Sequence, residues 1–174
     1  MYILKSKYNI LKPVKNKNLT RIGNNTDGGY VVDKNVIKNL KSFISFGLGD
    51  GSNVENCPWS FENHLIKKNK LIKIYVYDHT VSINDYIRIV LKYFRRLLLF
   101  RTNHKTFKKK VKYFLRYIRL INRERNFIFK KKVSNLNINN EINIKSIIKN
   151  NNIELKDIGL KCDIEGDEYK IINS

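Results

Sequence analysis

The chain has 174 residues, which is enough for one compact domain and too few for two comfortable ones. A hydrophobic share of 42% argues against general disorder, because it can supply a sizeable core. Lys and Arg number 35 against 15 Asp and Glu, a formal net charge of +20. This charge indicates an anionic partner, such as nucleic acid, a phosphorylated glycan or a membrane surface, or compositional drift in a chain rich in Lys, Asn and Ile.

The cysteines and the apolar runs predict the compartment. Cys57 and Cys162 stand far apart without a disulfide framework, and the histidines have no second ligand at metal spacing. Residues 1–18 lack the continuous apolar run of a secretory signal. Arg95 and Arg96 interrupt the most apolar stretch before it reaches the length of a membrane span. We therefore expect a soluble, cytoplasmic protein with neither a metal site nor a transmembrane segment.

The first predicted element is a hairpin in the N-terminal extension, residues 1–40. Between residues 21 and 32 an Asp-Gly-Gly triplet favours a tight turn that joins two short strands. This reading is sufficient structurally, and the spacing alone indicates no function for the hairpin.

Residues 41–82 form the predicted cofactor-binding core, which begins with a buried strand over 41–46. This strand ends abruptly in a glycine-rich turn. Glycines let the backbone approach a ligand, and they expose N–H groups where a helix starts. The turn fails the dinucleotide fingerprint because the third glycine would fall on Ser52, and a turn without any ligand is the alternative. The candidate cofactor-binding residues of this turn are Gly47, Gly49, Asp50 and Gly51.

A helix over 59–68 and a second strand over 71–77 follow the turn, and Asp78 and His79 stand at the end of that strand. An acid in this place can accept hydrogen bonds from both ribose hydroxyls of a bound nucleoside. A lone Asp after a strand is also a common turn former or helix cap. Its distance from the glycine turn favours the ribose interpretation, and His79 belongs to the same candidate cofactor site.

Residues 83–125 interrupt the alternation of strands and helices with a predicted basic helical hairpin that turns at 101–104. Each helix has an apolar face opposite a basic face. The basic face is either a solvated surface on two helices that cap the sheet or a docking surface for the phosphates of a lipid or a polyanionic substrate. The basic residues are Arg88, Lys92, Arg95 and Arg96 in the first helix and Lys108, Lys112, Arg116, Arg119 and Arg123 in the second.

The remaining core, residues 126–174, completes an alternation of strands and helices. This order is typical of a doubly wound parallel α/β sheet, in which ligands bind outside the carboxyl ends of the strands. The polar clusters of the chain all follow predicted strands, as such a site requires. The elements predicted in this region are a strand over 127–129, a helix over 144–150 and a fourth strand over 158–164.

Two acids end the fourth predicted strand, in the run Asp163-Ile164-Glu165-Gly166. Carboxylates two residues apart project to the same side of an extended chain, where they suit a cation, a hydroxyl or an amine. Asp163 or Glu165 could therefore act as a base toward a hydroxyl group. The alternative is that both acids cap a helix that begins at Gly166.

Together these segments resemble the FkbM-family methyltransferases, which are class I S-adenosylmethionine-dependent enzymes with a Rossmann-like sheet. The resemblance covers about residues 21–172 and is weakest in the basic hairpin. Its most specific part is the D-I-E-G motif after the fourth predicted strand. The matching segments are Arg21-Ile-Gly with Asp27-Gly-Gly-Tyr-Val-Val, Ser45-Phe-Gly-Leu-Gly-Asp-Gly, Ser60-Phe-Glu62, Tyr77-Asp78-His79-Thr80 and Leu160-Lys-Cys-Asp-Ile-Glu-Gly-Asp-Glu-Tyr169.

The resemblance implies methyl transfer from S-adenosylmethionine to an oxygen, often of a sugar or glycan-like acceptor. It places Gly47, Gly49 and Asp78 at the cofactor, and Asp163 and Glu165 beside the methyl group and the acceptor. A class I sheet normally has seven strands, whereas this chain stops after the fourth, so we expect a fragment or a sheet that a partner subunit completes. The alternative function is a polyanion-binding protein, for nucleic acid or an anionic membrane, with a vestigial methyltransferase half.

Overall fold

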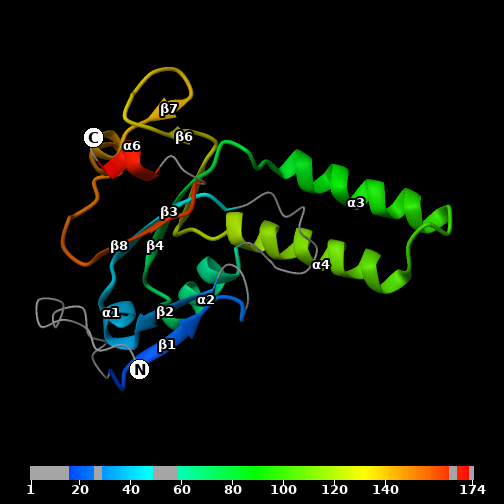
Figure 1. Cartoon of the computed structure of the whole chain (residues 1–174), viewed down its shortest axis with the longest axis horizontal. Helices are drawn as coiled ribbons and strands as arrows, with labels where there is room; N and C mark the ends of the chain where they lie inside the picture. The colour runs from blue at the N-terminus through cyan, green and yellow to red at the C-terminus, as the bar shows by residue number, and fades with distance from the viewer. Residues whose placement is uncertain (1–15, 26–28, 49–58, 165–167, 173–174) are drawn as a thin grey trace, which may run out of the picture.

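The computed structural model of the chain describes residues 16–25, 29–48, 59–164 and 168–172 (Figure 1). The strands and helices predicted from the sequence are present in their predicted order, and the structure adds α1, β6 and β7. The elements are β1 (Leu19–Ile22), β2 (Tyr30–Asp33), α1 (Lys34–Asn39), β3 (Ser42–Phe46), α2 (Ser60–Lys68), β4 (Lys73–Tyr77), α3 (Ile83–Leu98), α4 (His104–Ile121), β5 (Asn126–Phe129), β6 (Lys132–Val133), β7 (Glu141–Ile142), α5 (Ile144–Asn150), β8 (Ile158–Cys162) and α6 (Glu168–Ile172).

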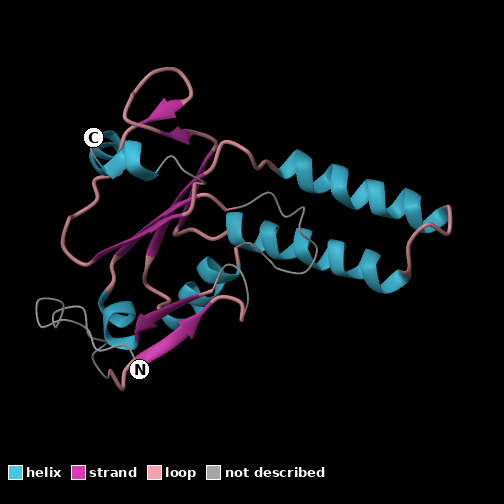
Figure 2. Ribbon diagram, viewed as in Figure 1, coloured by secondary structure: helices cyan, strands magenta, loops and turns pink. Residues whose placement is uncertain are grey.

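The central sheet has four strands in the order β5-β4-β3-β8, and every pairing in it is parallel (Figure 2). Along the chain these are the third, second, first and fourth strands of the sheet, so the winding reverses between β3 and β8. All five residues of β3 are buried, as expected for a strand enclosed by two neighbours. The predicted α/β class is confirmed, and the strand order is compatible with a Rossmann-like sheet.

Each face of the sheet has its own covering layer. One face packs against α1, α2, the β1–β2 hairpin and the C-terminal half of α4. The other face packs against α5, α6 and the short β6–β7 pair. The side chains of β3 alternate between the layers, with Phe43 on the first face and Ile44 and Phe46 on the second. The ends of the strands therefore open between two layers of helices.

The α3–α4 hairpin, residues 83–121, is called the arm below, and it projects away from the sheet (Figure 1). Ser82 and Asp85 form a capping box at the start of α3, and Asn103 caps α4. Only the base of the arm contributes to the core. The predicted hairpin is confirmed, but the interpretation that both helices cap the sheet is wrong for most of their length. None of the helices in the described ranges is long and apolar enough to cross a membrane.

Two local differences from the predicted elements have simple causes. β4 begins at Lys73 and not, as the sequence predicted, at residue 71. The Asn69 side chain accepts a hydrogen bond from the Leu71 N–H, which holds Leu71 in a turn, where it is 73% exposed. The short helix α1 was not expected from the sequence pattern. Asp33 starts it by accepting a hydrogen bond from the Asn35 N–H at 2.7 Å.

Candidate functional site

The ends of β3, β4 and β8 meet at one side of the sheet. The Gly47 N–H donates to the Tyr77 carbonyl at 3.1 Å, which ties the turn after β3 to the end of β4. The Asp163 N–H donates to the Phe46 carbonyl, also at 3.1 Å, which ties the end of β8 to β3. The site lies where the winding reverses, the usual place for a ligand in a doubly wound sheet. Sequence analysis predicted Gly47, Asp78 and Asp163 for this site, and the structure brings their backbones together.

Gly47 is required by the close approach of two backbones. Its φ of 78° lies in the left-handed region that residues with a side chain rarely adopt. A Cβ atom built on Gly47 would stand 2.0 Å from the Asp163 carbonyl oxygen, far inside van der Waals contact. The turn after β3 can therefore lie against the end of β8 only with glycine at this position.

Replacing Gly47 by Ala is expected to lower the free energy of unfolding by about 2 kcal/mol, because it adds backbone strain and pushes the two strand ends apart. Urea unfolding followed by circular dichroism measures the change. Gly23→Ala is the matched control, since Gly23 has a φ of 90° but follows β1 and lies outside the turn after β3. Equal losses in the two variants would show that the contact with Asp163 contributes nothing.

Asp78 is buried, 6% exposed, and its carboxylate is used by the surrounding backbone. One oxygen, Oδ2, accepts a hydrogen bond from the Leu48 N–H at 2.6 Å. The other, Oδ1, accepts from the Thr80 N–H at 2.7 Å and from the Thr80 hydroxyl at 2.6 Å. A carboxylate has about four acceptor positions, so these bonds leave about one that no described residue occupies. Asp78 thus forms the turn after β4 and fixes the start of the glycine-rich turn, and its predicted contact with ribose stays a prediction.

Of the other predicted cofactor residues, the structure describes only His79. His79 is exposed directly beside Asp78, at the same strand end. Gly49, Asp50 and Gly51 lie outside the described residues, and so does the second candidate base, Glu165.

The Asp163 side chain is half exposed and has two neighbours from other parts of the chain. The Tyr30 hydroxyl donates to Asp163 Oδ2 at 3.4 Å, and the Lys161 ammonium lies 3.9 Å from the same oxygen. Burial raises the pKa of the Tyr30 phenol, Lys161 opposes that shift, and the charge of Asp163 adds to it. Tyr30 belongs to the predicted N-terminal hairpin, to which the spacing assigned no function, so the fold places this hairpin at the strand-end site.

A buried ion pair lies behind the site, and sequence analysis did not predict it. Lys161 of β8 and Glu62 of α2 are 6% and 0% exposed, and their charged atoms are 3.3 Å apart. The Ser45 hydroxyl donates to the same Glu62 oxygen at 2.7 Å. The Lys161 ammonium also donates to the Gly47 carbonyl at 3.2 Å. One buried cation therefore connects α2, the turn after β3 and the carboxylate of Asp163.

Lys161 keeps its charge in this position. Burial by itself would lower the pKa of its ammonium group, but the carboxylates of Glu62 and Asp163 outweigh burial, and the net shift is upward. Lys161 is consequently a cation at neutral pH, and it stabilises the negative charge of both carboxylates. Nearby, burial raises the pKa of the Cys162 thiol, with smaller contributions from Glu168 and Asp163, so Cys162 is a poor nucleophile.

Comparisons with known proteins found no matching family model, no matching curated protein and no matching solved structure. The site combines the contact of Gly47 with the end of β8, a buried Asp78 carboxylate that fixes the turn after β3, and a half-exposed Asp163 carboxylate that a buried cation supports.

Proposed function

We propose that this chain binds S-adenosylmethionine at the carboxyl ends of β3, β4 and β8 and directs its methyl group to a hydroxyl of a sugar or glycan-like acceptor. The observation that carries the proposal is the meeting of Gly47, Asp78 and Asp163 where the winding of the sheet reverses. The resemblance of these segments to the FkbM family supplies the identity of the cofactor. The turn also departs from the dinucleotide fingerprint, which favours this cofactor over NAD.

The chain's residues suit separate parts of such a ligand. In this proposal the turn after β3, which Gly47 holds against the end of β8, lies beside the cofactor, and Asp78 accepts a hydrogen bond from a ribose hydroxyl. When bound, S-adenosylmethionine supplies a methyl group on a positively charged sulfur. What the chain must then contribute is orientation of the acceptor and a base for the proton of its hydroxyl. Asp163 is the proposed base, with Glu165 as the alternative.

The test is calorimetric titration of the whole chain with S-adenosylmethionine and, separately, with NAD. We expect binding of S-adenosylmethionine in the micromolar range and none of NAD. Asp78→Asn should weaken this binding at least about tenfold, because it removes the charge from hydrogen bonds that order the glycine-rich turn and the ribose. Glu154→Gln is the matched control, since the Glu154 side chain is 75% exposed in a surface ion pair.

Thermal unfolding of both variants establishes that each is folded before it is titrated. A folded wild-type chain that gives no heat with S-adenosylmethionine would overturn the proposal. So would binding of NAD in its place. Equal weakening by Asp78→Asn and Glu154→Gln would show that the cofactor does not bind at the end of β4.

A further inference from the structure

The arm carries a row of large apolar side chains that the described part of the chain leaves partly exposed. Ile87, Leu91, Phe94 and Leu98 follow one another at steps of four, three and four, so they lie on one side of α3. They are between 40% and 62% exposed. The other side of the apolar face of α3, which includes Tyr86, packs on α4 and on the core. An exposed apolar stripe on a projecting helix indicates an interaction surface.

The turn of the arm extends this stripe to its tip. Leu99 and Phe100 follow α3 directly, and Phe100 is 97% exposed. Its φ of 53° lies in the left-handed region, and the N–H groups of Phe100 and Arg101 close the turn on the carbonyls of Leu97 and Arg96. The exposed Phe100 ring therefore belongs to the turn between α3 and α4, and this turn lies at the end of the arm away from the sheet (Figure 1).

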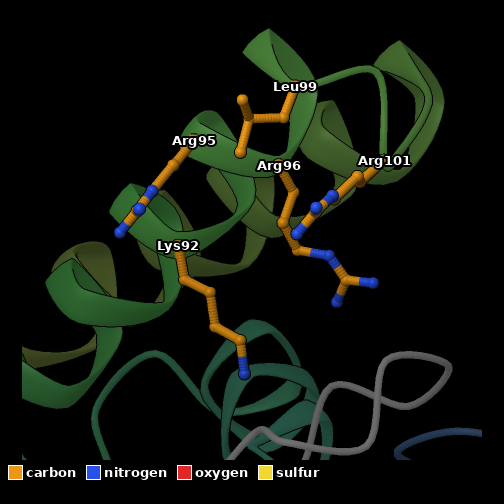
Figure 3. A pocket seen from close by; sticks show the side chains of 5 residues that line it. All are labelled: Lys92, Arg95, Arg96, Leu99 and Arg101. Atoms are coloured by element: carbon orange, nitrogen blue, oxygen red, sulfur yellow. The ribbon is translucent and has the colours of Figure 1, made fainter.

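Cations lie beside Leu99 at the tip of the arm. A cavity of about 410 Å³ near the tip is lined by Lys92, Arg95, Arg96, Leu99 and Arg101, with no acid among them. In Figure 3 the side chains of Lys92, Arg96 and Arg101 extend toward the same space, while Arg95 points away from it. Over residues 83–121 the sequence contains a single acid, Asp85, at the base of the arm. The tip is therefore both strongly positive and apolar.

Two other kinds of partner would each explain only one of these two features, either the positive charge or the exposed apolar stripe. Nucleic acid would account for the cations, but it gives no reason for an exposed row of Leu, Ile and Phe beside them. A second copy of the chain would cover the apolar stripe, but it would bring an equally positive arm against the first, and like charges oppose that contact. An anionic bilayer accounts for both features. Apolar side chains enter the acyl boundary, while Lys and Arg reach the lipid phosphates above it.

We propose that the arm docks this protein on anionic phospholipid membranes, with Leu98, Phe100 and their apolar neighbours inserted below the phosphates that Lys92, Arg96 and Arg101 contact. The arm has the form of a surface-lying amphipathic hairpin, in keeping with the finding that no described helix could span a membrane. The inference goes beyond the proposed methyl transfer and does not depend on it, because the arm and the strand-end site share no residue.

The experiment is flotation of the whole chain with vesicles of phosphatidylcholine alone and of an equimolar mixture of phosphatidylcholine and phosphatidylserine. We expect binding to the mixed vesicles and little to the neutral ones. Lys92→Gln with Arg101→Gln should weaken binding about 30-fold, because two cations are removed from the surface that faces the lipid phosphates. Leu98→Ser with Phe100→Ser should weaken it at least about tenfold, because two inserted side chains are lost.

Each double variant has a matched control elsewhere on the surface. Lys149→Gln with Lys156→Gln removes two exposed cations, and Leu71→Ser with Leu155→Ser removes two side chains that are 73% and 71% exposed. Both controls should bind the mixed vesicles within about threefold of the wild type. Unchanged thermal unfolding of every variant separates loss of docking from loss of the fold.

Three results would overturn the proposal. If the variant of Leu98 and Phe100 binds as tightly as the wild type while the variant of Lys92 and Arg101 does not, the arm is a polyanion surface only. A nucleic-acid oligomer should then compete with the vesicles. If sedimentation shows a dimer that the apolar variant abolishes, and vesicles are not bound, the stripe contacts a second copy. If the control variants weaken vesicle binding as much as the arm variants do, the binding comes from the net charge of the chain and not from the arm.

Discussion

Replacing Lys161 by Met is expected to lower the free energy of unfolding by about 3–5 kcal/mol, the usual effect of removing one partner from a buried ion pair. The substitution leaves the Glu62 carboxylate fully buried without its cation. Glu62 Oε2 already has no hydrogen-bond partner within the described part of the chain. The Gly47 carbonyl would also lose its contact with the Lys161 ammonium. Urea unfolding followed by circular dichroism measures the difference.

A surface ion pair provides the control for this substitution. Lys41 and Glu154 are 3.4 Å apart, but their side chains are 61% and 75% exposed, so Lys41→Met should cost less than about 1 kcal/mol. Replacing both Glu62 and Lys161 by Met should cost less than Lys161→Met alone, because no buried charge is then unpaired. A double loss equal to the sum of the single losses would contradict the pairing.

The buried ion pair should also affect how the free energy of unfolding depends on pH, at alkaline pH. Because folding raises the pKa of Lys161 above its unfolded value of about 10.4, its contribution is fully present below that pH. The contribution is lost as the pH rises through the folded pKa. The difference in stability between the wild type and Lys161→Met should therefore be constant near neutral pH and shrink only in strong alkali.

Trp59→Ala is expected to cost about 3–5 kcal/mol, the range for removing a large aromatic side chain from a core. Trp59 precedes α2 and is completely buried. Its ring contacts Tyr86 of α3 at 5.0 Å between centroids, and Tyr117 and Tyr113 of α4 at 5.7 and 6.5 Å, all near edge-to-face. This cluster joins the base of the arm to the core, so the arm should loosen when the ring is removed.

The loss in Trp59→Ala is measured by urea unfolding, with Trp59→Phe expected to retain part of the stability. Phe100→Ala is the control, because its ring is as large as the core aromatics but 97% exposed, and it should change stability by less than about 0.5 kcal/mol. A loss below about 1 kcal/mol in Trp59→Ala would show that the aromatic cluster does not hold the arm. The chain contains one Trp, so the wild-type fluorescence reports on this junction directly.

The central strands β3 and β4 were predictable because they are enclosed, with all five residues of β3 and four of the five residues of β4 buried. A strand covered on both faces is a continuous apolar run, and the turn that follows it needs residues such as Gly47 and Asp78, so both signals stand next to each other in the sequence. The two-residue strands β6 and β7 escaped prediction, since so short a pairing has no periodicity.

The buried ion pair and the exposed stripe were missed for different reasons. Lys161 interrupts an apolar strand, and Glu62 lies among the apolar residues of α2. A charged residue at a predicted core position was therefore the only sign of each partner in the sequence. That the two form an ion pair is visible only in the fold. In α3, periodicity identified Leu91 and Leu98 as members of an apolar face. It could not tell what covers that face, because amphipathicity describes one helix and not its neighbours.

The sheet order also determines how this chain must fold. β3 occupies the centre of the sheet, and one of its partners, β8, lies well over a hundred residues later, in the register Ser42 with Ile158. The pairing of β3 with β8 closes a long loop. The chain loses the entropy of that loop before the contacts between the two strands can compensate for it, so the sheet should form slowly. The β1–β2 hairpin and the arm consist of local contacts and should form first. During synthesis β3 therefore presents an open edge until β8 has been made, and this edge is the place where aggregation would start.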